Sequence, residues 1–176
     1  MRERIETVSK AYVLETLLGP MAILGDAHQI RESQLPAVTY QALIEEVHRS
    51  WGCAVDESRP AWIRELEHRV NGLWQGIDER FLDLKLDLTW ASPFQSKVYK
   101  ALRKMRPAQV ASYGDLALLI GSPRGARAVG GALRKNRIPL FIPCHRILAQ
   151  SGIGGFTAPG GLEQKYKLLR AEGWQS

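Results

Sequence analysis

Residues 112–135 read SYGDLALLIGSPRGARAVGGALRK, and this stretch contains two helix starts in close succession. Ser112 and Asp115 have the S-x-x-D spacing that begins a helix, and the apolar run after them stops at a glycine. A Ser-Pro pair then begins a second helix, which we expect over roughly 124–135. Two short helices joined by a minimal turn are the sequence outline of a helix-turn-helix.

The second helix of this pair has an unusual composition. Gly130 and Gly131 are adjacent, although two glycines lower helix stability, and arginines alternate with the small residues. Close approach of the backbone to a nucleic-acid groove would account for the glycines, and so would tight packing inside the domain. The arginines favour the groove. The residues that we expect to contact DNA are Ala126, Arg127, Gly130, Gly131 and Arg134.

A third helix is expected just before this pair. Ser92 can cap it, Pro93 fits its first position, and Gln95 completes a capping box. Its apolar stripe consists of Phe94, Val98, Leu102 and Met105. The basic residues of the same helix are expected to lie mostly towards solvent or a partner, and they are Lys97, Lys100, Arg103 and Lys104.

Charge divides the chain into two unlike halves. Residues 1–88 carry 10 Lys and Arg against 15 Asp and Glu, whereas residues 89–176 carry 14 against 3. The second half therefore has a net charge of +11 in a chain whose total is +6. A half this basic favours nucleic acid as a partner over an ordinary solvated face of mixed charges.

The acidic half has the pattern of a small antiparallel sheet followed by two helices. Apolar, strand-compatible runs extend over 11–24, with a Gly-Pro break inside, and over 29–35. Apolar residues then recur at helical spacing over 40–51 and over 62–74. We therefore expect an α/β fold in this half.

The end of the acidic half sets the domain boundary. Residues 81–88 alternate acids with leucines and allow one more strand, and residues 89–92 make a linker. A chain of 176 residues permits one domain or two small ones. We expect two: an N-terminal α/β domain over 1–88 and a C-terminal domain over 89–176.

Composition and termini favour a reducing, cytoplasmic setting. The chain is 45% hydrophobic and 24% charged, as globular proteins are, and no apolar run approaches the roughly 18 residues of a membrane span. Acidic residues stand among the first six, where a signal peptide would be apolar. The two cysteines, Cys53 and Cys144, have no CxxC partner, so we expect free thiols.

Cys144 stands out from the surrounding sequence. It ends the apolar run IPLFIP at 138–143, which prolines bound, and His145 and Arg146 follow it directly. A free cysteine is most often an inert core residue, and a Cys-His pair alone is a weak signal. The basic neighbours in a domain of net charge +11 indicate an electropositive setting, which stabilises the reactive thiolate.

Several motifs of the basic half together resemble one family, the O6-alkylguanine-DNA alkyltransferases, also called methylated-DNA–protein-cysteine methyltransferases. The similarity runs with consistent spacing from about residue 94 to 173, half of the chain, with a longer loop over 154–159 than some members have. The N-terminal half is similar only in length and in its strand-then-helix order. The matching motifs are RAVGGA at 127–132, Asn136, IPCHRI at 142–147, GGL at 160–162 and LLRAEG at 168–173.

The resemblance implies a fold and a way of binding DNA. It implies a ribonuclease H-like α/β N-terminal domain, followed by a mostly helical domain whose helix-turn-helix binds the minor groove. Arg127 would enter the base stack in place of the target nucleotide, and Tyr113 would press the target phosphate so that the base rotates outwards. The partner is then double-stranded DNA carrying an alkylated guanine.

The resemblance also implies the chemistry. Cys144 would take the alkyl group from the guanine O6 irreversibly, once per molecule, with O4-alkylthymine as a further candidate substrate. His145 would draw the thiol proton through a water, and Glu172 would orient the imidazole. Asn136 would brace the turn that carries the cysteine, and Tyr113 would protonate the guanine N3. The loop over 151–160 would wall the pocket, whose residues would be Leu133, Pro139, Ser151, Gly155, Phe156 and Gly160.

No cofactor and no metal site are expected. Some family members bind zinc in the N-terminal domain through two Cys and two His, but this half has only Cys53, which stays an unexplained loop thiol. His28, His48 and His68 are expected to be surface residues. We expect a monomer with no membrane partner, in the cytoplasm near the nucleoid, or in the nucleus of a eukaryote.

Three other classes of protein compete with this interpretation. An alkyltransferase-like protein would bind alkylated DNA without repairing it, but such relatives replace the nucleophile, and Cys144 is present. A cysteine hydrolase would use Cys144 and His145 but gives no reason for a helix-turn-helix. A transcription factor would explain the basic half and leave the Cys-His-Glu set without a role.

Overall fold

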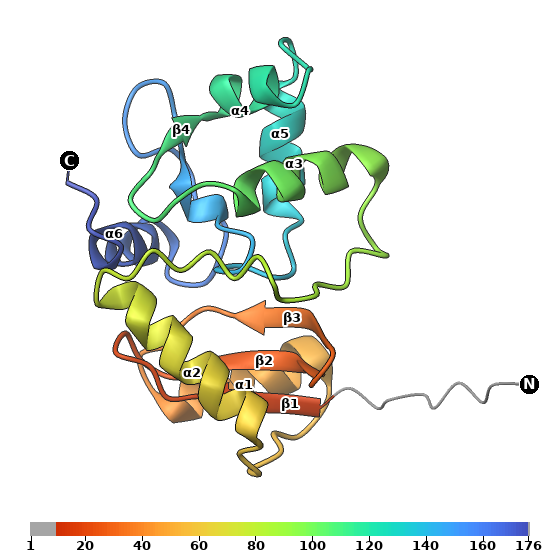
Figure 1. Ribbon diagram of the computed structural model, residues 1–176, viewed down its shortest axis with the longest axis vertical. Coiled ribbons are helices and arrows are strands. Elements are labelled where there is room, and N and C mark those ends of the chain that lie inside the picture. Colours follow the sequence, from red (N-terminus) through yellow and green to blue (C-terminus); the bar gives the residue numbers. More distant parts are fainter. Residues whose placement is uncertain (1–9, 176) are drawn as a thin grey trace, which may run out of the picture.

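The computed structural model describes residues 10–175, so the acidic start of the chain, on which the prediction of no signal peptide rests, lies outside the described part. Figure 1 shows a small sheet with two helices at one end of the molecule and a cluster of short helices at the other. None of the described helices is long and apolar enough to cross a membrane.

The sheet of the N-terminal half is antiparallel, as its sequence pattern predicts. It consists of β1 (Lys10–Leu14), β2 (Met21–Asp26) and β3 (Gln29–Gln34), in the order β1-β2-β3. The turn between β1 and β2 contains Gly19, whose φ of 115° favours a residue without a side chain. The prediction of a small antiparallel sheet is thus confirmed.

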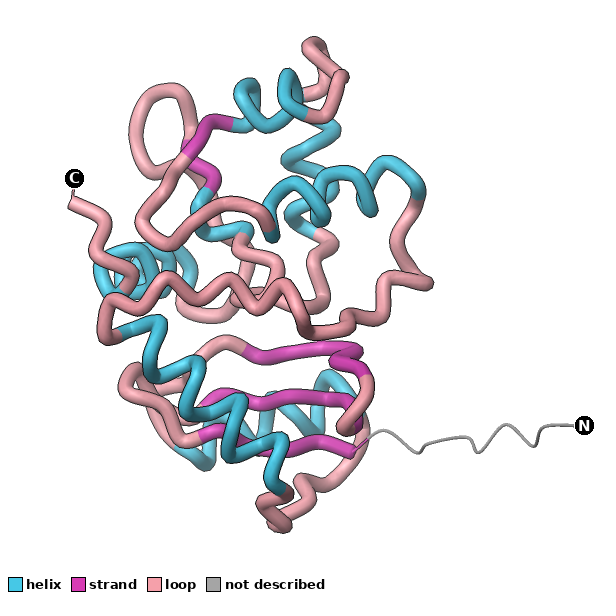
Figure 2. The backbone as a smooth tube through the Cα atoms, viewed as in Figure 1, coloured by secondary structure: helices cyan, strands magenta, loops and turns pink. Residues whose placement is uncertain are grey.

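Two helices cover opposite faces of this sheet, α1 (Tyr40–Trp51) and α2 (Ala61–Trp74), and Figure 2 shows one on each side of the strands. Side chains of a strand alternate between the two faces. Ala22 of β2 accordingly packs in a cluster with residues of α1, whereas Ile23 belongs to the larger core that includes residues of α2. Both predicted helices are confirmed.

Residues 81–88 do not form the additional strand. Leu86 alone makes a single bridge, to Ile30 of β3. Phe81 has a left-handed φ of 52°, and the carboxylate of Glu79 accepts a hydrogen bond from its N–H at 2.6 Å. The chain therefore turns where the alternation of acids and leucines predicted an extended strand. The same alternation also suits a loop whose leucines pack on the core while its acids face solvent.

The C-terminal half consists of short helices and one two-stranded parallel pair. Capping boxes are present at Ser92 and Ser112, which confirms both predicted helix starts. The elements are α3 (Pro93–Arg103), β4 (Ala111–Ser112), α4 (Tyr113–Leu119), α5 (Ala126–Arg134), the 3-10 helix η1 (Cys144–Arg146), β5 (Ile147–Leu148) and α6 (Gly161–Ala171).

The turn between α4 and α5 is longer than the sequence pattern indicated. Ser122 and Pro123 lie in the turn, and the helix begins at Ala126 rather than near residue 124. The Ser122 carbonyl accepts the N–H of Gly125 at 2.7 Å, so the chain closes a turn before it enters the helix. The helix-turn-helix arrangement itself is confirmed, with α4 packed against α5.

Helix α3 joins the two halves of the molecule. Val98, Leu102 and Met105 are buried as predicted. Arg103 is not turned to solvent, since its Nη2 donates to the carbonyl oxygens of Phe81 and Leu84 at 2.5 and 2.9 Å. The prediction for this arginine was wrong because two carbonyls of the 81–88 loop lie where helical spacing alone indicated solvent.

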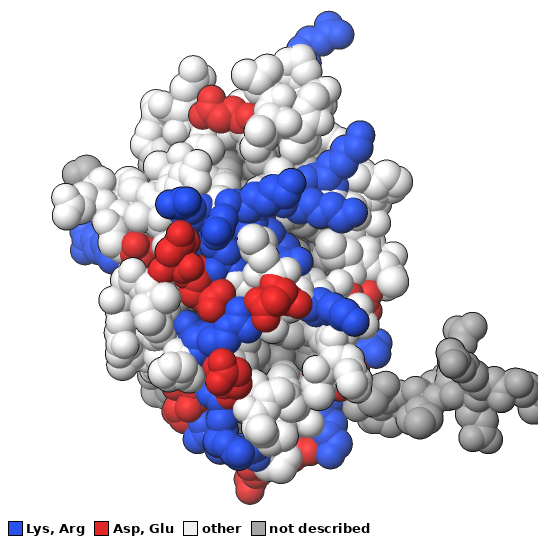
Figure 3. Space-filling model, viewed as in Figure 1, with Lys and Arg blue, Asp and Glu red and all other residues white. Residues whose placement is uncertain are grey.

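A continuous core runs across residue 88. The rings of Phe81 and Phe141 meet edge to face at 5.0 Å, and the Ser33 hydroxyl donates to the Pro139 carbonyl at 2.7 Å. On the face shown in Figure 3, Lys and Arg gather along α3, while most Asp and Glu lie over the N-terminal half. The two halves therefore differ in charge but share one hydrophobic interior.

Candidate active site

Cys144 begins η1 and lies at the wall of a cavity of about 760 Å³. The thiol residue is buried, with 9% of its surface exposed. The cavity brings together eleven of the residues that the sequence singled out, namely Tyr113, Ala126, Arg127, Gly130, Leu133, Arg134, Asn136, Pro139, Cys144, Gly155 and Phe156. Gly131, Ser151 and Gly160 do not line it.

The N-terminal half also contributes to this cavity, which the sequence did not indicate. Glu32, Ser33 and Gln34 of β3 and Ser50 of α1 line it. Backbone and side chain of Ser33 bond to the carbonyls of Arg137 and Pro139, more than a hundred positions away. No local pattern in β3 signals such a long-range contact.

The turn that leads to the cysteine is held by one side chain. Nδ2 of Asn136 donates to the Ile142 carbonyl at 2.9 Å and to Sγ of Cys144 at 3.3 Å, and Oδ1 accepts from the Ile138 N–H at 3.0 Å. Leu140, inside this turn, has a left-handed φ of 74°, which side chains rarely adopt. The Asn136 amide thus offsets a strained backbone and touches the thiol directly.

His145 and Glu172 form a buried pair. Nε2 of His145 lies 2.8 Å from Oε1 of Glu172, and both side chains are almost fully buried. Glu172 caps the C-terminus of α6, where the helix dipole disfavours a carboxylate. Burial also disfavours its ionisation, but His145 and Arg146 outweigh both effects and hold the pKa of Glu172 at about 2. The carboxylate is therefore charged throughout the neutral range.

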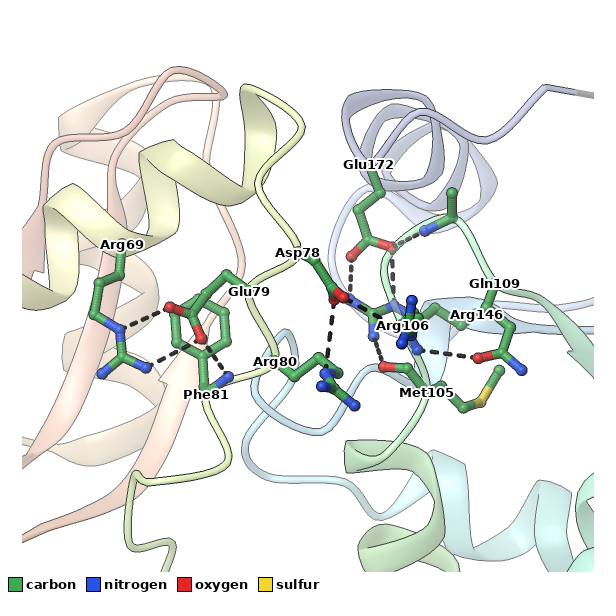
Figure 4. A network of polar contacts seen from close by, with 11 residues as sticks. Arg69, Asp78, Glu79, Arg80, Phe81, Met105, Arg106, Gln109, Arg146 and Glu172 are labelled. Carbon is green, nitrogen blue, oxygen red and sulfur yellow. Dashed lines mark hydrogen bonds and ion pairs between the residues drawn. The ribbon is translucent and has the colours of Figure 1, made fainter.

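The Arg146 guanidinium points to the Glu172 carboxylate (Figure 4). Its Nε and Nη2 donate to the two carboxylate oxygens at 2.8 Å each, and Nη1 donates to the Met105 carbonyl at 2.7 Å. The Ala108 N–H donates to the same carboxylate at 3.3 Å. The expectation that Arg146 makes the surroundings of Cys144 electropositive is thus wrong, because its charge is neutralised by Glu172.

The Cys144 thiol is therefore protonated like an ordinary buried cysteine. Burial raises the pKa of Cys144 above its usual value, and the amide of Asn136 and the charge of Lys165 only partly counteract it. A thiolate at this position would therefore need a base that takes the proton.

Lys165 is a buried cation whose charge acts on the Cys144 thiol, and the sequence assigned it no role. Its side chain is fully buried, and Nζ donates to the carbonyls of Ile147 and Ile153 at 2.6 and 2.7 Å. Burial lowers the pKa of Lys165 to about 8. One signal was present: Lys165 precedes Leu168 and Leu169 by three and four positions, which places it on the buried face of α6.

Tyr113 and Arg127 take different positions at the cavity. The Tyr113 ring lies against Gly130, where an added Cβ would stand in ordinary van der Waals contact 3.7 Å from the ring, so this contact does not itself require a glycine. Burial and the nearby Cys144 raise the pKa of Tyr113, and its hydroxyl therefore stays protonated. Arg127 is exposed on α5 and makes no ion pair within residues 10–175.

Comparison with known proteins identifies the family. A profile described as 6-O-methylguanine DNA methyltransferase, DNA binding domain, matches residues 93–174. The methylated-DNA–protein-cysteine methyltransferase of Shigella flexneri is 44% identical over 168 residues, which cover 92% of this chain and 94% of the relative. The chain belongs to the methylated-DNA–protein-cysteine methyltransferase family.

The extent of the similarity varies among members of this family. The methylated-DNA–protein-cysteine methyltransferase of Metallosphaera sedula is 42% identical over 105 residues, which are 60% of this chain and 64% of the relative. The chain thus spans somewhat less than two thirds of that relative's length.

Solved structures share the fold. The O6-methylguanine methyltransferase of Mycobacterium tuberculosis superposes with a TM-score of 0.71 at 30% identity, covering 93% of this chain and 92% of that one. The same bacterium's OGT in complex with DNA gives a TM-score of 0.69 at 26% identity, covering 93% of both chains. The α/β half and the helical half are therefore arranged as in these proteins.

Proposed function

We propose that this protein repairs DNA by direct reversal of damage, transferring an alkyl group from the O6 of guanine to its own Cys144. One observation carries the proposal: Cys144, touched by the Asn136 amide and followed by the buried pair of His145 and Glu172, opens into a cavity beside α5. A thioether has no easily hydrolysed bond, so each molecule acts once.

The transfer balances with groups that surround this cavity. His145 takes the thiol proton, the thiolate attacks the alkyl carbon in line, an S–C bond forms and the C–O bond breaks. The electron pair of that bond stays on the guanine, and the protonated hydroxyl of Tyr113 supplies a proton at N3. Lys165 adds a positive charge that favours the thiolate.

Duplex DNA carrying the alkylated guanine is the proposed partner. Arg127 fills the base stack after the guanine rotates out, and Tyr113 presses on its phosphate. The minor groove lies on α5, where Ala126, Gly130 and Gly131 allow close backbone approach and Arg134 meets a phosphate. The family relative that was solved with DNA supports this partner.

The cavity wall determines which base is accepted. Leu133, Pro139, Gly155 and Phe156 line the pocket, and the loop that bears the last two runs from Ser151 to Gly160. O4-alkylthymine is a second candidate substrate, since the reacting carbon would stand in an equivalent position.

The organisation of the chain is part of the proposal. We take residues 1–88 as a ribonuclease H-like α/β domain, a view that the antiparallel sheet with a helix on each face supports, and 89–176 as the DNA-binding and alkyl-acceptor domain. The protein acts as a monomer in the cytoplasm at the nucleoid, or in the nucleus of a eukaryote.

Intact-protein mass spectrometry tests the proposal. After incubation with a duplex that contains O6-methylguanine, the protein should gain one methyl group, located on Cys144 by peptide mapping. Cys144→Ser should gain none while still binding the duplex, because its hydroxyl does not ionise near neutral pH. Cys53→Ser is the matched control and should react fully. Turnover, or methylation of Cys53, would contradict the proposal.

A further inference from the structure

The carboxylate of Glu172 accepts four hydrogen bonds in a buried setting. Oε1 is reached by Nε2 of His145 and Nη2 of Arg146, both at 2.8 Å, and Oε2 by Nε of Arg146 and the Ala108 N–H at 2.8 and 3.3 Å. Figure 4 shows the two contacts that Arg146 makes. A guanidinium and a backbone N–H can only donate. A proton on Glu172 would therefore have one possible acceptor, the imidazole.

This arrangement fixes where His145 carries its proton. While Glu172 is ionised, Nε2 must be the donor, so the lone pair of the neutral imidazole is on Nδ1. Nδ1 is buried and has no hydrogen-bond partner among residues 10–175, so it is available to take a proton. If Glu172 were protonated, it would donate to Nε2, and the proton of the ring would move to Nδ1, the atom that has to act as base.

We propose that Arg146 is the positioning residue that keeps His145 in the Nε2–H form, by holding Glu172 ionised through a two-bond fork. The effect of Arg146 on the reaction rate rests on the proposed alkyl transfer. Its effect on the position of the His145 proton does not depend on that proposal. A planar guanidinium matches both carboxylate oxygens, which a single-point cation does not do. The third bond, to the Met105 carbonyl, aligns the fork.

A second effect of Arg146 is electrostatic. Buried against His145, the residue after Cys144, an unpaired Glu172 carboxylate would leave a net negative charge that disfavours a thiolate, whereas the pair with Arg146 carries no net charge. The other titratable or charged groups near Cys144 and the Glu172 cluster come from several elements. They are Cys144 of η1, Lys165 of α6, Tyr99 of α3, Tyr113 of α4, and Arg106 beyond α3, which lies 3.8 Å from Asp78.

The direct test is nitrogen NMR of the His145 ring in the full chain, which needs no activity. In the wild type we expect the proton on Nε2 near neutral pH. In Arg146→Gln, which keeps a hydrogen-bonding side chain and loses the charge, the Nδ1–H form should become populated. Arg146→Lys keeps the charge and loses the fork, so it should restore the wild-type pattern only in part. An Nε2–H ring in Arg146→Gln would overturn the inference.

The kinetic test uses single-turnover transfer from the free base O6-methylguanine across pH. Arg146→Gln should move the midpoint of the rate profile upwards by about one pH unit, which is about a tenfold loss near neutrality. Arg103→Gln is the matched control, a half-buried arginine that bonds to carbonyls outside the cluster, and its profile should not move. An unmoved midpoint in Arg146→Gln would also overturn the inference.

A double variant separates this role from a purely structural one. If Arg146 acts through Glu172, adding Arg146→Gln to Glu172→Gln should cost no further rate, whereas independent packing losses would add. The same double variant removes both buried charges, so it serves if Arg146→Gln alone does not fold. Absence of transfer in the wild type would refute the proposed function and leave the NMR result to decide on Arg146.

Discussion

The cluster beside Cys144 and the exposed face of α5 show opposite ways of building a functional surface. In the cluster, Glu172 is buried and all its acceptor positions are paired with donors. On α5, Arg127 and Arg134 are exposed and form no ion pair among the described residues. Buried, paired groups fix the geometry of a reaction, whereas exposed, unpaired cations are available to phosphates and bases. Variants in the two regions should therefore fail differently.

The largest contrast is expected from Arg127→Ala. Extruding a base costs a few kcal/mol of stacking, and in the proposed function Arg127 offsets this cost by filling the gap. We expect single-turnover repair of duplex DNA to fall about a hundredfold, since about 2.7 kcal/mol corresponds to that factor. Reaction with the free base should change less than about twofold, because no stack is involved. Equal losses of rate on both substrates would mean that Arg127 acts in the alkyl-transfer step itself, and the contrast between the two regions would not hold.

Glu172→Gln should show the reverse pattern, with equal losses on duplex and free base. Glu172 has a pKa of about 2, so its own titration lies far below the working range and cannot shape the profile near neutrality. Without the carboxylate, His145 accepts the thiol proton less readily, and burial already raises the pKa of Cys144. The midpoint of the rate profile should rise by about one pH unit, or about tenfold in rate below it.

The control for this variant is binding. The carboxamide keeps the shape of the side chain, so affinity for an unreacted duplex should stay within about twofold of wild type. If the pH profile of Glu172→Gln overlaid that of the wild type, Glu172 would be a structural helix end and His145 would not depend on it.

The same contrast explains what the sequence could predict. Helix starts with capping boxes at Ser92 and Ser112 and the strand-then-helix order of the first half follow from local patterns, and the structure has them. Cys144 and its neighbours in sequence were predicted as site residues from a short sequence motif. Local patterns gave wrong predictions at two places. A turn stands in the 81–88 loop, where a strand was expected, and another stands before α5, where the helix was expected to begin.

Contacts made over long separations were beyond reach of the sequence. Arg103 was expected to face solvent or a partner, but it bonds to carbonyls near residue 81. Arg146 was expected to act on Cys144, but it bonds to Met105 and Glu172. The charge of a residue was predictable in each case, but its partner was not. The β3 wall of the cavity belongs to the same class of contact.

The smallest effect is expected from Arg134→Gln, which tests the exposed side of the comparison through salt. Each phosphate that a cation neutralises releases counterions, so the logarithm of the binding constant falls with the logarithm of salt concentration. Arg134 is exposed in the last turn of α5, and losing one phosphate contact should reduce that slope by about 0.9. Affinity at low salt should fall severalfold and the free-base rate should be unchanged.

Arg49→Gln is the matched control, because Arg49 is also exposed but pairs with Glu46 in the acidic half. Its slope should equal that of the wild type, measured by fluorescence anisotropy with an undamaged duplex at several salt concentrations. If the salt dependence of binding had the wild-type slope in Arg134→Gln, Arg134 would not contact a DNA phosphate. A reduced slope in both variants would mean that DNA responds to the net charge of the protein, and the distinction between paired and unpaired cations would fail.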